Sequence, residues 1–196
     1  MKCFEQLVKD HITSHLGASM DHLQFAYRAN RSTEDAIPTL LHLTLTHLKY
    51  KNTNARILLV DFSSAFNAIL LHQLVEKLQL LGVGTKTCNW VLDFLTERKQ
   101  TVKIGSRTSN TITVSIGSPQ GCVLSPLLFT LLTHDCTTMH NTNHRIKLAD
   151  DPTIVFLIIN GDVSAYRDEL EFLMTWCNSH NLSLNTGKTK EIIIDF

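Results

Sequence analysis

Two apolar runs of strand length, residues 56–62 and 153–159, each lie close to acidic residues in this sequence. The first run, RILLVDF, ends with Asp61 and Phe62, and the second, TIVFLII, comes directly after Asp150, Asp151 and Pro152. Aliphatic and β-branched runs of this length, bounded by polar residues, predict buried strands. Adjacent carboxylates repel each other, so such a pair is typical of a turn or of a place where a cation supplies the missing charge.

Helical and strand-like segments alternate along the chain, which predicts an α+β fold. Apolar residues at spacings of three and four predict helices, and alternating apolar and polar residues predict strands. Pro38 indicates that its helix either begins late or bends, whereas Pro126 falls in a first helical turn, where proline is tolerated. The helices are expected at residues 3–16, 32–51, 65–81 (ended by Gly82), 86–99 and 163–181 and after the loop 116–121; the strands are expected at 56–62, 100–104, 111–116, 145–149, 153–159 and 190–196, with ADDP as the turn between two of them.

The composition is that of a globular protein with balanced charge and without a disulfide framework. With 196 residues, 43% of them hydrophobic, the chain has enough material for one sizeable core. Lysine plus arginine equals aspartate plus glutamate at 18 each, so a polyanion site must be a local patch. The five cysteines form no CxxC pair, which favours free thiols in a reducing compartment.

The sequence shows neither a signal peptide nor an apolar run of the roughly 18 residues that a membrane span requires. An intracellular location, cytoplasmic or nuclear, with no membrane partner, is therefore the expectation.

The acidic residues predict a candidate metal site. If the strands at 56–62 and 153–159 are neighbours in one sheet, then Asp61, Asp150 and Asp151 converge at one edge. Such a cluster suits Mg²⁺, and two ions about 3.5–4 Å apart assist phosphoryl transfer. The alternative is structural: the Asp pair makes a tight turn and Asp61 caps a helix. The loop GSPQG, residues 117–121, is similarly open, because its glycines allow a close approach to a ligand but also suit a simple connector.

Several motifs resemble, in order and spacing, those of reverse transcriptases from LINE-like, non-LTR retrotransposons. They are VDFSSAFN (60–67), GSPQGCVLSPLLF (117–129), LADD (148–151) and LSLNTGKTKEIIIDF (182–196), and FAYRANRSTEDAI (25–37) is similar to the family's fingers segment.

The resemblance implies a right-hand polymerase palm, with an antiparallel sheet packed on helices, partial fingers and no thumb. The chain is then a single reverse transcriptase domain fragment, with about 1–55 as part of the fingers and about 56–196 as the palm with inserted fingers elements.

The resemblance also implies residue roles in an RNA-directed DNA polymerase that takes an RNA template, a DNA primer and dNTPs. Asp61 and Asp150 hold two Mg²⁺ ions, for which Mn²⁺ is a substitute, and Asp151 supports the metal site. Phe66 crowds the sugar 2′-hydroxyl, and Lys188 lies near the triphosphate. The template base and incoming nucleotide are contacted by one loop, formed by Ser118, Pro119, Gln120 and Gly121.

Two departures from the family pattern keep an alternative open. Leu148 stands where relatives carry an aromatic residue, and Pro152 stands where they carry a small one. Proline removes a backbone N–H and fixes φ, which would shift the turn. The alternative is therefore a catalytically inactive retrotransposon remnant that at most binds nucleic acid weakly. A metal-dependent phosphohydrolase or nuclease is a further alternative, but the sequence offers no clear water-positioning base for it.

Overall fold

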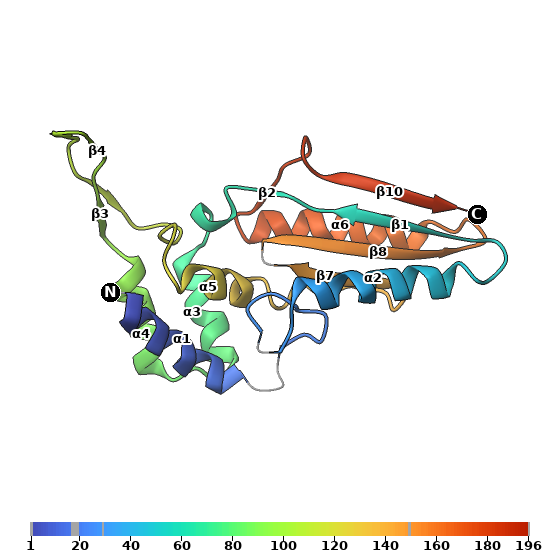
Figure 1. Ribbon diagram of the computed structural model, residues 1–196, viewed down its shortest axis with the longest axis horizontal. Coiled ribbons are helices and arrows are strands. Elements are labelled where there is room, and N and C mark those ends of the chain that lie inside the picture. Colours follow the sequence, from blue (N-terminus) through green and yellow to red (C-terminus); the bar gives the residue numbers. More distant parts are fainter. Residues whose placement is uncertain (1, 17–19, 29, 149, 196) are drawn as a thin grey trace. The chain divides into compact units, whose positions relative to one another are not determined.

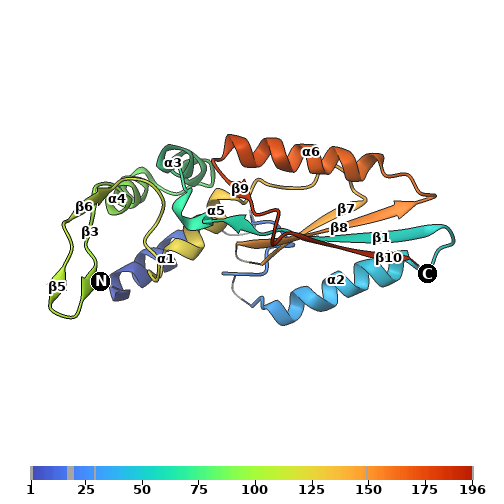
Figure 2. The ribbon, with the colours of Figure 1, turned by 90° about the horizontal axis from the view of Figure 1, so that it is seen from above.

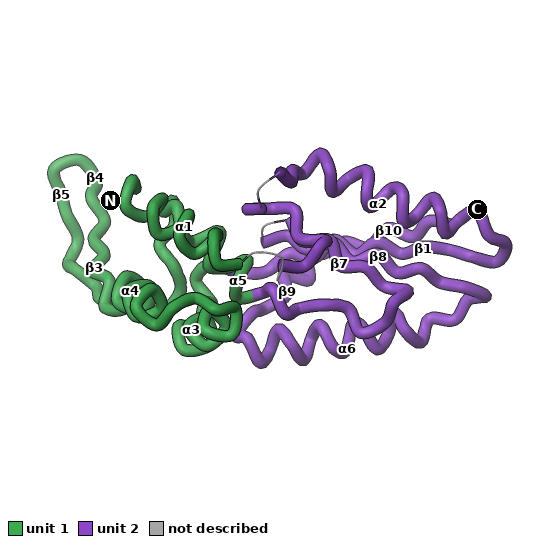
Figure 3. Tube along the Cα trace, turned by 90° about the horizontal axis from the view of Figure 1, so that it is seen from below, with its two compact units in different colours: residues 1–19, 66–132 green, residues 20–65, 133–196 purple. Residues whose placement is uncertain are grey.

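The protein folds into two compact units, each built from two separate stretches of sequence. A computed structural model describes residues 2–16, 20–28, 30–148 and 150–195 (Figure 1). Unit 1 comprises residues 1–19 and 66–132, and unit 2 comprises residues 20–65 and 133–196 (Figure 3).

Unit 2 is built around a four-stranded antiparallel sheet with the strand order β10-β1-β8-β7. The two apolar runs that border the acidic residues are therefore neighbours, as the sequence predicted. The strands are β1 (Thr53–Leu59), β7 (Asn143–Leu148), β8 (Asp151–Ile159) and β10 (Lys190–Asp195). A separate pair, β2 (Phe62–Ser63) and β9 (Ser183–Leu184), completes the strands of this unit.

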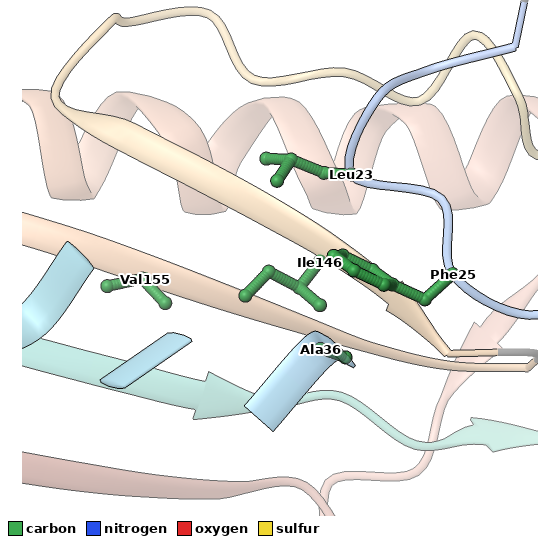
Figure 4. Close-up of a cluster of buried hydrophobic side chains, with 5 residues drawn as sticks. All are labelled: Leu23, Phe25, Ala36, Ile146 and Val155. Atoms are coloured by element: carbon green, nitrogen blue, oxygen red, sulfur yellow. The ribbon is translucent and has the colours of Figure 1, made fainter. Parts of the chain in front are cut away.

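Helices α2 (Thr33–His47) and α6 (Ser164–Ser179) cover opposite faces of this sheet (Figure 2). Because both faces are covered, consecutive residues of β8 from Thr153 to Phe156 are all buried. On the α2 face a cluster of buried apolar side chains joins the helix, the sheet and the segment before α2 (Figure 4); its members are Leu23, Phe25, Ala36, Ile146 and Val155.

Helix α2 begins at Thr33 despite the proline in its second turn. Ser32 and Asp35 form a capping box, in which each side chain accepts a hydrogen bond from the other residue's backbone N–H. Pro38 lies inside the helix, so the helix does not begin late. The cap satisfies N–H groups that would otherwise be left without partners at the helix start.

Unit 1 is mainly helical. Its core is formed by fully buried side chains, among them Leu74, Leu78, Val91, Leu127 and Leu131. These side chains come from α3 (Leu71–Leu80), α4 (Thr85–Leu95) and α5 (Ser125–Leu132), and the described part of the unit also contains α1 (Lys2–Leu16). The carboxylate of Glu5, itself buried, accepts a hydrogen bond from the backbone N–H of Val123 at 2.7 Å, which ties α1 to the segment before α5.

A hairpin connects α4 to the GSPQG loop, as the sequence predicted. It has an outer and an inner ladder and turns at Gly105, whose φ is +60°. The inner ladder pairs β3 (Arg98–Gln100) with β6 (Ile112–Val114), and the outer ladder pairs β4 (Lys103–Ile104) with β5 (Arg107–Thr108).

Several predicted boundaries were wrong. The helix expected at 86–99 ends at Leu95, and Arg98 and Lys99 belong to β3. The strand expected at 56–62 ends at Leu59, so Asp61 lies in the connection to β2. The turn expected at ADDP is shorter, because Asp151 and Pro152 already belong to β8.

The helix expected at 65–81 is interrupted after a short 3₁₀ turn, Ala65–Asn67, and resumes as α3. The backbone carbonyls of Phe66 and Ile69 accept hydrogen bonds from Ser118 and Gly117 instead of continuing a helical ladder. In the parts of the chain that the structure describes, no helix is long and apolar enough to cross a bilayer.

Candidate active site

Asp61 and Asp151 lie at the same end of two paired strands. Leu59 pairs with Thr153 in the antiparallel register of β1 and β8, and Val60 donates its backbone N–H to the carbonyl of Pro152 at 3.0 Å. Asp61 follows Val60 directly. Burial and the charge of Asp150 raise the pKa of Asp151, and the negative charge of Asp61 contributes after them, so the carboxylates of Asp61 and Asp151 interact electrostatically.

Asp150 joins them from the turn between β7 and β8. Leu148 and Asp151 form the last pair of this ladder, which makes the connection a two-residue turn. Asp150 is half-buried within it, and Ala149 of the LADD motif lies outside the described residues. Asp61 and Asp150 both act electrostatically on Asp151, which supports the prediction that the three acids share one sheet edge, while their role as a site stays a prediction.

The acids repel one another electrostatically. The pKa of Asp151 is raised by partial burial and then by the negative charges of Asp150 and Asp61. Lys188 acts in the opposite direction and lowers the pKa of Asp151, so this predicted lysine faces the same cluster. Its position follows from the turn after β9, where its backbone N–H donates to the carbonyl of Asn185 at 3.1 Å.

The same turn holds Asp61 in place. The backbone N–H of Asn185 donates to the carbonyl of Asp61 at 2.8 Å, and Asp61 donates its own N–H to the Thr189 hydroxyl at 3.2 Å. The sequence analysis did not predict a role for Asn185 or Thr189. The available signal is the turn-forming sequence NTGKT between two strands, which brings Asn185 and Thr189 beside Lys188.

Tyr27 is a second residue that the sequence reasoning missed. Its φ of +57° is uncommon for an aromatic residue. Its phenol has a raised pKa because of burial and the negative charge of Asp150. The segment is fixed to β7, since Phe25 donates its N–H to the carbonyl of Lys147 and Lys147 donates to the carbonyl of Leu23. These backbone hydrogen bonds to β7, which precedes the acidic turn, therefore bring Tyr27 close to Asp150.

The remaining predicted residues lie in unit 1, where two backbones pack closely together. Ser118 donates its N–H to the carbonyl of Phe66 at 2.8 Å, and Gly117 donates to Ile69 at 3.0 Å. A Cβ on Gly117 would lie 2.7 Å from the Cα of Asn67, which is too close for any other residue. The GSPQG loop and the turn carrying Phe66 are thus held together by a contact that requires glycine.

The ring of Phe66 is half-buried and packs against Phe129 of α5, with ring centroids 5.3 Å apart. Beside this loop is a cavity of about 770 Å³. It is lined by the predicted residues Ser118, Pro119 and Gln120, together with Asn67, Phe94, Arg98, Lys99, Gln100, Val114 and Ile116. Gly121 has a φ of +73° and is exposed, and it does not line the cavity.

The acidic cluster has donor atoms that suit a divalent metal but, among the described residues, is not a preformed group of ligands. Within residues 2–16, 20–28, 30–148 and 150–195, no three histidine, cysteine, aspartate or glutamate side chains form a group that could hold an ion. The chemistry of the donors nevertheless suits a divalent cation, because carboxylate oxygens are the ligands of Mg²⁺ and a positive charge would offset the repulsion at Asp151. The residues therefore fit a metal in identity and charge.

Comparison with known families and proteins gives matches along nearly the whole chain. Residues 1–193 match the family described as "Reverse transcriptase (RNA-dependent DNA polymerase)". Among curated proteins, the chain is 24% identical over 200 residues to the probable RNA-directed DNA polymerase from transposon X-element of Drosophila melanogaster. It is 23% identical over 206 residues to the RNA-directed DNA polymerase from mobile element jockey of Drosophila funebris. Each alignment covers 97% of this chain but only 22% of the relative, so the chain spans about a fifth of their length.

Solved structures share the fold at low sequence identity. Telomerase from Candida tropicalis, in complex with a fragment of telomeric RNA, superposes with a TM-score of 0.71 at 13% identity. The corresponding telomerase from Candida albicans gives 0.70 at 15% identity. The matches cover 96% and 95% of this chain and 33% and 34% of those chains. The mixed helix and sheet arrangement is therefore that of a right-hand polymerase.

Proposed function

Because the chain belongs to the reverse transcriptase (RNA-dependent DNA polymerase) family, we propose that it is a catalytic fragment of an RNA-directed DNA polymerase. It adds deoxynucleotides from dNTPs to the 3′-hydroxyl of a DNA primer paired with an RNA template. The sheet with α6 corresponds to the palm, and about residues 1–55, which include α2, correspond to part of the fingers.

The observation that carries this proposal is the convergence of Asp61, Asp150 and Asp151 at one edge of the β1–β8–β7 sheet. Asp61 lies in the connection after β1, Asp150 in the turn before β8 and Asp151 at the start of β8, and burial followed by the charges of Asp150 and Asp61 raises the pKa of Asp151. A fold maintains such repulsion where a bound cation or a reaction uses it.

Each residue then has a role that its position supports. Asp61 and Asp150 would hold two Mg²⁺ ions, or Mn²⁺ in their place, and these would stabilise the charge that develops on the attacking and leaving oxygens. Asp151 adds negative charge to the same edge. The ammonium group of Lys188, exposed and facing Asp151, is placed to pair with the triphosphate of the incoming nucleotide. Asn185 and Thr189 keep the backbone of Asp61 in position.

The nucleotide and template contacts come from unit 1. The half-buried ring of Phe66 would crowd a 2′-hydroxyl and so favour deoxynucleotides. Ser118, Pro119 and Gln120 line the cavity in which a base is bound, and Gly121 lets the chain turn beside it. The side-chain amide of Gln120 provides both a donor and an acceptor for a base edge or a sugar.

The test is primer extension on an RNA template with the purified chain, dNTPs and Mg²⁺. We expect Asp61→Asn and Asp150→Asn each to abolish metal-dependent incorporation while the far-UV circular dichroism stays that of the parent. Asp93→Asn, which makes the same substitution at an exposed carboxylate of α4, is the control and should retain the parental rate. Incorporation that survives in both site variants would exclude the assignment.

An inactive remnant is the second candidate, and two observations favour keeping it. The described residues contain no preformed group of three metal ligands, and Leu148 and Pro152 depart from the family pattern beside the acidic turn. In that case the folded parent gives no extension with Mg²⁺ or Mn²⁺. Extension by the parent that is lost in Asp150→Asn would exclude the remnant.

A further inference from the structure

The positive charge of unit 1 is concentrated on its hairpin. From residue 98 to residue 134 the sequence contains four basic residues and no aspartate or glutamate, although the whole chain is balanced at 18 positive and 18 negative side chains. The four are Arg98, Lys99, Lys103 and Arg107, all on the strands of the hairpin 98–114, which we call the basic hairpin.

Three of these cations are uncompensated. Every residue from 99 to 113 is exposed, and within the described residues no ion pair involves Lys99, Lys103 or Arg107. The hairpin also exposes apolar side chains, with Ile104 at 77%. A two-stranded hairpin alone is marginally stable in water, so a partner that covers these exposed side chains would stabilise it. Its uniform positive charge favours a polyanion.

Arg98 has a different role, because it anchors the hairpin to the GSPQG loop. Its guanidinium donates to the backbone carbonyls of Leu95, Ile116 and Gly117 at 2.6–3.0 Å. Next to it, Lys99 and Gln100 line the same cavity as Ser118 and Gln120. The basic hairpin and the proposed base-binding loop therefore form one continuous surface within unit 1.

We propose that the basic hairpin binds the phosphate backbone of a single-stranded nucleic acid whose bases enter the adjoining cavity. This inference rests on the proposed function, and it adds a strand-binding surface to it. Lys99, Lys103 and Arg107 contact successive phosphates. The cavity offers the side-chain amides of Gln100 and Gln120 and the ring of Phe94, and these can contact only unpaired bases.

The experiment measures the anisotropy of fluorescein-labelled 20-nucleotide oligo(rU) and oligo(dU) with the 196-residue chain over a series of salt concentrations. Each lost phosphate contact lowers the slope of log K against log salt by about 0.7 for a single strand. For Lys103→Gln/Arg107→Gln we expect the slope to fall by about 1.4 and the affinity at low salt to fall on the order of tenfold. The matched control is Lys49→Gln/Lys51→Gln, which removes two exposed cations from unit 2 and should bind as the parent does.

An unchanged slope in Lys103→Gln/Arg107→Gln overturns the proposal, and so does an equal loss in the control. Binding that survives the charge removal but is lost in Ile104→Ser would assign the surface to apolar contacts and overturn it as well. If the double variant loses similar affinity for oligo(rU) and oligo(dU), the hairpin recognises the phosphate backbone. A loss of affinity for only one of the two oligonucleotides contradicts this.

The two proposals fail separately. Asp61→Asn should lose primer extension and keep the parental salt slope. If no variant or parent extends a primer but the slope still depends on Lys103 and Arg107, the polymerase assignment fails and the strand-binding surface stands. If the parent extends a primer and the slope does not depend on these residues, the reverse holds.

Discussion

Val60 donates its backbone N–H to the carbonyl of Pro152, but Pro152 cannot donate in return. The next pair, Leu59 with Thr153, is the last one of the β1–β8 ladder, so β1 ends one residue before the proline position. The β7 side loses nothing, because Lys147 directs its N–H and carbonyl to Leu23 and Phe25. The proline thus ends one ladder beside Asp61 and leaves the turn of Asp150 in register.

Pro152→Ala should leave the free energy of unfolding within about 1 kcal/mol of the parent. The variant gains an N–H that can pair with the Val60 carbonyl, worth about 0.5–1.5 kcal/mol. It loses the proline's restriction of the unfolded chain, worth about 0.4–1 kcal/mol. Urea denaturation measures the sum. The control is Pro126→Ala, in the first turn of α5, where the new N–H finds no partner. This control should lose only the stability that comes from the proline's restriction of the unfolded chain. Equal losses of unfolding free energy in the two variants would mean that the new N–H at position 152 does not pair with Val60.

Gly117→Ala should destabilise the protein far more than Gly105→Ala. Both glycines have positive φ, at +71° and +60°, so both substitutions cost about 1–2 kcal/mol of backbone strain. Only at Gly117 does the added Cβ meet backbone, 2.7 Å from Asn67, while Gly105 faces open space. We expect a total loss of roughly 3 kcal/mol or more at Gly117. Urea unfolding compares the two, and similar losses would show that the loop does not pack against Asn67.

Glu169→Gln should cost about 3–5 kcal/mol of stability. Glu169 is fully buried and its carboxylate accepts a hydrogen bond from Arg145 at 2.7 Å, with Arg145 itself 3% exposed. Removing the acid leaves a buried guanidinium without its counter-charge. Glu191→Gln breaks the partly exposed pair with Arg56, at 3.7 Å, and should cost no more than about 1 kcal/mol. The midpoints of urea denaturation report both values. Equal losses of stability would mean that burial does not make the Arg145–Glu169 pair costlier to break than the Arg56–Glu191 pair.

Cys177 should make stability fall at high pH. Burial, and then the proximity of Cys136, raise the pKa of the Cys177 thiol from 9.0 to about 12. The folded state therefore holds this proton more tightly than the unfolded state. The contribution is fully present below pH 9 and is lost as the pH rises from about 9 to about 12. In Cys177→Ala the free energy of unfolding should decline less steeply above pH 9 than in the parent, and parallel curves would contradict the shift.

The sequence predicted the elements well where periodicity alone decides. The helices at 3–16 and 163–181 and the hairpin after α4 are confirmed, because their patterns match the burial that the fold provides. The boundaries that failed depend on contacts between distant segments. Nothing local shows that the carbonyls of Phe66 and Ile69 accept bonds from Gly117 and Ser118, so the helical spacing of 65–81 continues through a break.

In the candidate site, too, the sequence predicts what local patterns determine and misses what depends on contacts between distant segments. The prediction that Asp61 approaches the pair Asp150–Asp151 rests on one assumption, that the two apolar runs are neighbours in a sheet, and the register confirms that assumption. Tyr27, Asn185 and Thr189 were missed because only tertiary structure brings them to the acids. The metal ions, and the roles of Phe66, Gln120 and Lys188, remain predictions.

Phe66→Ala should relax the choice of sugar if the proposed polymerase reaction is correct. The ring is fixed on one side by Phe129, at a centroid distance of 5.3 Å, so it cannot readily give way to a 2′-hydroxyl. A steric pocket of this kind discriminates by roughly 10–200-fold, and the truncation should raise ribonucleotide incorporation relative to dNTPs by on the order of tenfold. Phe129→Leu, which removes the support and keeps Phe66, should give a smaller change in the same direction. The measurement is single-nucleotide primer extension with dNTP or rNTP, and an unchanged ratio in Phe66→Ala would mean that this ring does not face the sugar.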